Sequence, residues 1–243
     1  MNIALILSGG IGTRMGLDVP KQYIEVGGRP IFTYCVESLS LHPQIDAILI
    51  VADLEWQKFI TGWLGIYDRK GKFRGFSLPG RNRQLSIYHG LCDIRDFADD
   101  RDYVMVHDAV RPMLSMKMIE ECLCAVDGHD GVMPGLPMKD TVYSSMDGKS
   151  ITALLNRGEI YAGQAPEVFR LKTYYEANRR LLPGHILEVN GSAEPAVMAG
   201  MDIAIIPGDE NNFKITTKTD LEHFIQIIES RKDIFEEKQD DRL

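Results

Sequence analysis

The sequence has few cysteines, and none of them are spaced as in a metal site or a redox motif. Its four cysteines, Cys35, Cys92, Cys122 and Cys124, form no CxxC pair. This pattern argues against a structural zinc site and against a framework of disulfides. We therefore expect free thiols, most of them buried, and a reducing cytoplasm as the location of the protein.

The sequence also lacks an excess of positive charge and any long apolar run. Its 243 residues include 27 Lys and Arg against 35 Asp and Glu, a formal net charge of -8 at pH 7. Proteins that bind nucleic acid or anionic membranes over a broad surface are usually basic, so neither partner is expected. No run approaches the roughly 20 apolar residues of a membrane span, and no cationic leader precedes the first apolar run. Any site for an anion must therefore be local.

Apolar runs alternate with segments of helical periodicity along most of the chain. The predicted strands are 2–7, 47–52, 103–107, 131–137 and 201–208, and the predicted helices are 30–42, 55–67, 83–97, 116–126 and 217–230. Buried strands that alternate with helices are typical of an α/β fold whose mostly parallel sheet is flanked by helices. We expect one domain that spans residues 1–243.

The stretch from Lys139 to Phe169 interrupts this alternation. Two runs of β-forming residues flank MDGKS (146–150), in which the Asp-Gly pair predicts a hairpin turn. We interpret residues 138–168 as a β-arm that projects from the sheet.

A glycine-rich loop follows the first predicted strand, in the sequence LSGGIGTRMGLDVPKQY (7–23). Such loops expose backbone N–H groups to an anion because no Cβ blocks close approach. A Walker loop is excluded, since no lysine directly follows the last glycine. A dinucleotide fingerprint fits poorly because Met15 stands where its third glycine belongs, although Asp53 could then bind a ribose. A simple chain reversal is the other alternative, but Arg14 and Lys21 favour a triphosphate, whose charge they would neutralise.

This loop resembles the G-G-x-G-T-R-[ML]…P-K signature of sugar-nucleotide pyrophosphorylase-type nucleotidyltransferases. Further segments resemble the polyol-phosphate cytidylyltransferases, which act on 2-C-methyl-D-erythritol 4-phosphate or ribitol 5-phosphate. These segments are GRNRQLSI (80–87), VHDAVRP (106–112), PMKDTV (137–142), NRGEIYAGQAPEVF (156–169) and NNFKITTKTDL (211–221). The resemblance implies a Rossmann-like sheet of the nucleotide-diphospho-sugar transferase type. It also implies transfer of CMP from CTP to a polyol phosphate, Mg²⁺ as cofactor, and a homodimer formed through the β-arm.

The resemblance further implies roles for individual residues. The catalytic residues would be Arg14, Lys21 and Lys214. The nucleotide-binding residues would be Ser8, Gly9, Gly10, Gly12, Gly80, Arg83 and Ser86. The acceptor-binding residues would be Arg111, Asp140, Thr141 and Arg157. Asp108 follows a predicted strand, where open α/β sheets place ligands, and would be the Mg²⁺ ligand. Each of these roles has an alternative without a ligand. Ser86 and Asp108 would then be helix caps, His107 would be a packing residue, and the arm would only hold a dimer together.

Two segments depart from the family pattern, and both belong to the acceptor side. Ala165 and Glu167 stand where the family has threonine and glutamine. The region VNGSAEPAVMAG (189–200) lacks the aspartate of a T-D-[DE]-A-S motif, and Glu194 is the nearest acid. A non-catalytic nucleotide-binding paralogue, or a nucleotidyltransferase with another sugar-phosphate acceptor, therefore stays open. The pathway would be isoprenoid precursor synthesis or that of a cell-surface polymer.

Overall fold

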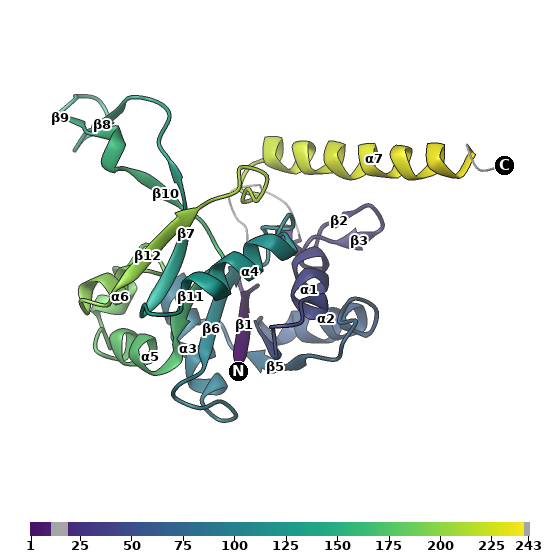
Figure 1. Ribbon diagram of the computed structural model, residues 1–243, viewed down its shortest axis with the longest axis horizontal. Coiled ribbons are helices and arrows are strands. Elements are labelled where there is room, and N and C mark those ends of the chain that lie inside the picture. Colours follow the sequence, from purple (N-terminus) through teal and green to yellow (C-terminus); the bar gives the residue numbers. More distant parts are fainter. Residues whose placement is uncertain (11–18, 241–243) are drawn as a thin grey trace.

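A mixed eight-stranded sheet forms the centre of the computed structural model, which describes residues 1–10 and 19–240 (Figure 1). The strand order is β10-β7-β11-β6-β1-β4-β5, with β12 paired to β7. The strands are β1 (Asn2–Leu7), β4 (Ala47–Val51), β5 (Phe73–Ser77), β6 (Tyr103–Asp108), β7 (Gly131–Pro137), β10 (Tyr161–Gly163), β11 (Glu167–Arg170) and β12 (Ile203–Pro207). Only β10 and β11 run antiparallel to their neighbours in this sheet. The predicted mostly parallel sheet is thus confirmed.

Helices cover both faces of the sheet because successive side chains of a buried strand point to opposite faces. The helices are α1 (Phe32–Leu41), α2 (Leu54–Tyr67), α3 (Arg83–Ile94), α4 (Met116–Ala125), α5 (Leu171–Arg179), α6 (Glu194–Met198) and α7 (Lys218–Asp240). On β1, Ala4 and Ile6 belong to the core formed with α1, α2 and α4, whereas Ile3 and Leu5 belong to the core formed with α3, α5 and α6. None of the helices in the described ranges is long and apolar enough to cross a membrane.

Helix α3 is fixed at its beginning by Asn82 and along its length by Gly90. The Asn82 Oδ1 accepts a hydrogen bond from the backbone N–H of Leu85 (2.8 Å), as expected for a helix N-cap. A Cβ on Gly90 would lie only 2.5 Å from the side chain of Leu5 on β1. Because glycine allows this close approach, the first turn of α3, with Arg83, is held near the carboxyl end of β1.

Several predicted boundaries were wrong, and some elements were not predicted. The first helix begins at Phe32 rather than at Pro30, because Pro30 pairs with Glu25 in a short hairpin of β2 (Glu25–Val26) and β3 (Arg29–Pro30). Helix α7 extends to Asp240, beyond the predicted end at Ser230. The strands β5, β10 and β11 and the helices α5 and α6 had no clear apolar pattern. For example, α5 has the sequence LKTYYEANR, in which polar residues predominate.

The interruption after β7 contains the predicted hairpin, which lies outside the body of the fold (Figure 1). Strands β8 (Val142–Ser144) and β9 (Ala153–Leu155) pair with each other in a separate antiparallel sheet. Asp147 forms the turn by accepting hydrogen bonds from the N–H groups of Lys149 and Ser150, both at 2.8 Å. Gly148 takes a φ of +69°, which suits glycine. Strand β10 and the beginning of β11, within the range 138–168, pair in the main sheet.

Candidate active site

A cavity of about 880 Å³ lies at the carboxyl ends of the parallel strands β1, β4 and β6. Open α/β sheets bind their ligands at this edge. The described residues that line it include, of those predicted from the sequence, Gly9, Gly10, Lys21, Gly80, Arg83, Ser86, Asp108 and Lys214. The fold therefore brings together segments that are up to about two hundred residues apart in the chain.

The described part of the glycine-rich loop is held from behind by two buried side chains, Gln22 and Tyr23. The Gln22 Nε2 donates hydrogen bonds to the carbonyls of Ser8 (2.7 Å) and Gly10 (2.8 Å). The Tyr23 hydroxyl donates to the Ser8 carbonyl (2.9 Å), and the Ser8 hydroxyl donates to the Tyr23 oxygen (3.1 Å). The Ser8 side chain thus supports the backbone of the loop.

Two of the predicted glycines permit close backbone contacts beside the cavity. A Cβ on Gly9 would lie 2.6 Å from the side chain of Pro79, and a Cβ on Gly80 would lie 2.6 Å from that of Leu85. The hydroxyl of Ser86 accepts a hydrogen bond from the N–H of Gly80 (2.9 Å) and donates to the carbonyl of the helix cap (2.8 Å). Ser86 therefore shapes the cavity wall by holding the loop before α3 against its first turn.

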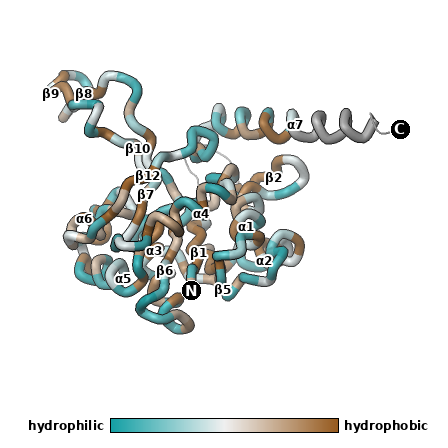
Figure 2. The backbone as a smooth tube through the Cα atoms, in the orientation of Figure 1, coloured by the Kyte–Doolittle hydropathy of each residue, from teal (hydrophilic) through white to brown (hydrophobic). Residues whose placement is uncertain are grey.

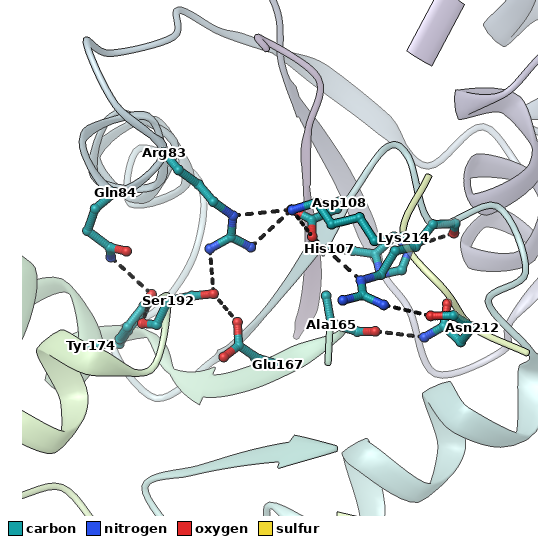
Figure 3. A network of polar contacts seen from close by, with 11 residues as sticks. Arg83, Gln84, His107, Asp108, Ala165, Glu167, Tyr174, Ser192, Asn212 and Lys214 are labelled. Atoms are coloured by element: carbon teal, nitrogen blue, oxygen red, sulfur yellow. Dashed lines mark hydrogen bonds and ion pairs between the residues drawn. The ribbon is translucent and has the colours of Figure 1, made fainter. Parts of the chain in front are cut away.

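Asp108 lies among three cationic side chains, two of which, Arg83 and Lys214, are labelled in Figure 3. Arg83 donates to Oδ1 through Nε (3.2 Å) and Nη2 (3.0 Å). On the other oxygen, Oδ2, the Nζ of Lys214 lies at 3.0 Å and the Nε of Arg111 at 3.6 Å. Burial alone would raise the pKa of Asp108, but the charges of Arg83, Lys214 and Arg111 hold it well below its usual range. Asp108 is thus an ionised carboxylate that gathers three cations at the cavity.

Arg111 and His107 are fixed on the far side of Asp108. The Nη1 of Arg111 donates to the carbonyl of Asn212 (2.6 Å), and the Nδ2 of Asn212 donates to the carbonyl of Ala165 (2.7 Å). His107 donates from Nε2 to the carbonyl of Arg111 (3.1 Å). Burial lowers the pKa of His107 to about 4, so its imidazole is neutral near pH 7. His107 therefore supports the loop that carries Arg111 and adds no positive charge to the site.

The other predicted site residues lie elsewhere. Asp140, Thr141 and Arg157 are exposed on the segment between β7 and β10, apart from the described lining of the cavity. The Nη1 of Arg157 donates to the carbonyl of Lys139 (2.9 Å). Gly12 and Arg14 lie outside the described residues.

Reasoning from sequence missed a buried polar network behind Arg83 (Figure 3). The Nη1 of Arg83 donates to the Oγ of Ser192 (2.6 Å), and the Ser192 hydroxyl donates to the carboxylate of Glu167. The hydroxyl of Tyr174 donates to the Ser192 carbonyl (2.7 Å). Glu167 was noticeable only as a departure from a family pattern. Nothing in the sequence indicated Ser192, which is 109 residues from Arg83.

Two carboxylates, Asp53 and Glu55, also line the cavity and were not among the predicted residues of a nucleotidyltransferase. Asp53 follows β4 and is the N-cap position of α2, so its place after a buried strand was a usable signal. In the sequence, Asp53 has a predicted role only under the alternative of a dinucleotide fingerprint.

Comparison with known proteins decides the family. The model of the family 2-C-methyl-D-erythritol 4-phosphate cytidylyltransferase (IspD) matches residues 2–230. The chain belongs to this family. A relative described as ribitol-5-phosphate cytidylyltransferase, from Streptococcus pneumoniae serotype 2 strain D39, is 31% identical over 240 residues, covering 94% of this chain and 99% of that protein.

Solved structures of the IspD family have the same fold. The 4-diphosphocytidyl-2C-methyl-D-erythritol synthase from Anaerococcus prevotii aligns with a TM-score of 0.79 and 26% identity, over 94% of this chain and 96% of that one. The 2-C-methyl-D-erythritol 4-phosphate cytidylyltransferase from Francisella tularensis aligns with a TM-score of 0.76 and 25% identity, over 91% and 97%. The predicted family, fold class and enzyme class are confirmed. This IspD-family chain is a CTP-dependent cytidylyltransferase of polyol phosphates.

Proposed function

We propose that CTP binds in the cavity and that the acceptor is ribitol 5-phosphate. An oxygen of the acceptor phosphate attacks the α-phosphorus of CTP, and the bond from that phosphorus to the bridging β-phosphate oxygen breaks. The products are CDP-ribitol and pyrophosphate. A phosphate oxygen is nucleophilic near pH 7 without a general base, which is compatible with a buried, neutral His107. The observation that carries the proposal is the convergence of Lys21, Lys214 and Arg83 at the same edge of the sheet.

The residues that line the cavity form two groups, one suited to the triphosphate and the other to the nucleoside. A Cβ on Gly10 would meet no atom within 4 Å, so the backbone there is open to the phosphates, and Gly9 and Lys21 line the same cavity. Arg83, on the first turn of α3, would contact the nucleoside, with the loop that Ser86 holds beside it. Lys214 would neutralise charge where the two phosphates react. Gly12 and Arg14 remain predicted members of the triphosphate site.

Mg²⁺ is part of the proposal, with Asp108 as its protein ligand. No three His, Cys, Asp or Glu side chains among the described residues are grouped as a metal site. Asp108 would supply the one protein ligand of the ion through an oxygen that now faces Lys214 and Arg111, and the ion would take its remaining ligands from the CTP phosphates and water, as is common for Mg²⁺. When bound, the ion would neutralise charge on the triphosphate. Asp108 meanwhile keeps Arg83, Arg111 and Lys214 close to the phosphates.

The choice of acceptor is supported by the relative from Streptococcus pneumoniae, whose name gives ribitol 5-phosphate. The run EIYAGQ (159–164) favours the same type, whereas PKQY (20–23) and HDAVRP (107–112) are more similar to the methylerythritol type. Arg111 would bind the acceptor phosphate from this chain, and Asp140, Thr141 and Arg157 would do so from a second subunit.

The four cysteines are free thiols, which supports a reducing cytoplasm as the location.

A pyrophosphate-release assay tests the reaction and its substrates. We would combine CTP, UTP, GTP or ATP, each with Mg²⁺, with ribitol 5-phosphate, 2-C-methyl-D-erythritol 4-phosphate or other sugar phosphates. We expect release only with CTP, and at least about tenfold higher kcat/KM for ribitol 5-phosphate. Preference for the methylerythritol phosphate would contradict the proposed acceptor. Activity with UTP or GTP in place of CTP would contradict the cytidine site.

We also propose that residues 138–160, the part of the predicted arm (138–168) outside the main sheet, form a homodimer. Apolar and polar positions are mixed along it (Figure 2), and its apolar side chains have little cover: Tyr143 is 53% exposed, Met146 91%, Ile151 69% and Leu154 65%. Exposed apolar side chains on a projecting ribbon are typical of an interface. A second copy of the chain would cover them and bring its own acceptor residues to the site.

Leu154→Asp is expected to convert this dimer into a monomer, because burying the new carboxylate in an apolar interface is unfavourable. Light scattering coupled to size exclusion measures the change. Leu54→Asp is the matched control, since Leu54 is 72% exposed but lies on α2, away from the arm. A dimer that persists in Leu154→Asp, or one that is equally lost in Leu54→Asp, would exclude the arm as the interface.

A further inference from the structure

Arg83 has two anchors rather than one (Figure 3). Its Nε and Nη2 donate to Asp108, at the end of β6, and its Nη1 donates to Ser192, in the loop before α6. Asp108 does not hold Arg83 exclusively, because its other oxygen contacts Lys214 and Arg111. The Nη1 end of the guanidinium, which does not bond to Asp108, is fixed by the hydrogen bond to Ser192.

Ser192 can serve as this anchor only if its own proton is directed elsewhere. A serine hydroxyl has one proton to donate, and its oxygen can accept. Here the proton is donated to Glu167, which leaves the oxygen to accept from Arg83. Both side chains are buried, with Ser192 3% and Glu167 6% exposed, so water does not compete freely for these bonds. The backbone of Ser192 is fixed as well, since Tyr174 donates to its carbonyl.

Glu167 is the second acid in this cluster. Burial raises its pKa, while the charges of Arg83 and Arg111 and the hydrogen bond from Ser192 favour its carboxylate form. Glutamine, which the family pattern has at this position, would provide a similar shape without the charge. The loop that carries Ser192 departs from the family pattern too. The hydrogen bond from Ser192 to Glu167 connects the two segments that depart from the family pattern, and Ser192 also accepts a hydrogen bond from Arg83.

We propose that Glu167 is a positioning residue for Arg83: acting through Ser192, it holds the guanidinium at the cavity wall where the nucleoside part of CTP binds. This inference rests on the proposed function, in which Arg83 contacts the nucleoside and the triphosphate lies at the glycine-rich loop. A guanidinium that is ordered before CTP arrives does not have to be ordered during binding, and this favours affinity. The effect should be confined to the nucleoside side of the site.

Two variants test the inference: Glu167→Gln, which removes the charge, and Ser192→Ala, which removes the link. We expect each to weaken CTP binding, and to raise its KM, by about five- to tenfold. The kcat at saturating CTP and the inhibition constant of pyrophosphate should stay within about twofold. Calorimetric titration of CTP and steady-state kinetics provide these values. If the loss of the Glu167 charge acted only by making the whole site more positive, both CTP and pyrophosphate would instead bind more tightly.

A double-mutant cycle tests whether Glu167 acts through Arg83. In the background of Arg83→Ala, the change Glu167→Gln should have no further effect on CTP binding. Asp68→Asn is the matched control, because Asp68 accepts from the buried hydroxyl of Ser40 (2.6 Å) in the same way but far from the cavity. It should lower the unfolding temperature without changing CTP binding.

The inference would be overturned by unchanged or tighter CTP binding in both variants, by an equal change for pyrophosphate, or by additive effects with Arg83→Ala. Thermal unfolding identifies a variant that does not fold, and Ser192→Ala, which only removes an oxygen, then carries the test alone. Failure of the proposed function would be seen separately, as a wild-type protein that neither binds CTP nor releases pyrophosphate.

Discussion

Asp108→Ala is expected to lower kcat/KM by at least about 1,000-fold and to destabilise the protein by about 3 kcal/mol. The side chain is only 8% exposed and faces Arg83, Lys214 and Arg111. Without it, three cations repel one another in a partly buried site, and none keeps its position at the cavity. The loss of activity should therefore be larger than for any single one of the cations. Chemical denaturation and steady-state kinetics measure the two effects.

The pH dependence of this stabilisation has a definite sign. Because the pKa of Asp108 is depressed in the folded state, its contribution is present above the unfolded value of about 4 and is lost as the pH falls through the folded value. The difference in unfolding free energy between wild type and Asp108→Ala should thus be constant between about pH 6 and 8. Asp99→Ala is the control, since Asp99 pairs with Arg101 at the surface. Near-normal stability and turnover of Asp108→Ala would contradict our assignment of Asp108.

Lys21→Ala is expected to lower kcat about 100- to 1,000-fold while weakening CTP binding less than about tenfold. Lys21 lines the cavity at the beginning of a short 3-10 helix, next to the loop of Gly9 and Gly10. Negative charge grows on the departing pyrophosphate in the transition state, so a lysine there stabilises the transition state more than the ground state.

Single-turnover kinetics and CTP titration separate the two effects of Lys21→Ala. Lys117→Ala is the control, because Lys117 is an exposed lysine that pairs with Glu121 on α4. Equal losses in kcat and in CTP affinity would reduce Lys21 to a ground-state binding role, and unchanged kcat would exclude it from catalysis.

Much of the site could be predicted because its residues follow buried strands directly. The loop with Gly9 and Gly10 follows β1, and Asp108 ends β6, so a run of apolar residues places each of them at the same edge of the sheet. Lys214 is different: the resemblance alone assigns it to the site, and no local pattern puts residue 214 beside residue 108.

The parts that could not be predicted depend on contacts between distant residues with no local pattern. Edge strand β5, with the sequence FRGFS, includes a glycine and an arginine and has only one buried residue, Ser77. The bond between Arg83 and Ser192 joins α3 to a loop over a hundred residues later, and both are ordinary polar residues in their own segments. Such pairs are decided by packing of the whole chain, which a single sequence does not reveal.

The reversed direction of β11 has a consequence for how such an enzyme can change its acceptor. Glu167, the first residue of β11, pairs with Val106 near the carboxyl end of β6, so one side of the site is built by residues that precede a strand. The glycine-rich loop, in contrast, follows β1, and Asp108 is the last residue of β6. The two sides of the site are therefore built by separate stretches of the chain. A substitution such as that at Ala165 can change one stretch while the loop after β1 stays the same, whereas a substitution at Glu167 also reaches Arg83 through Ser192.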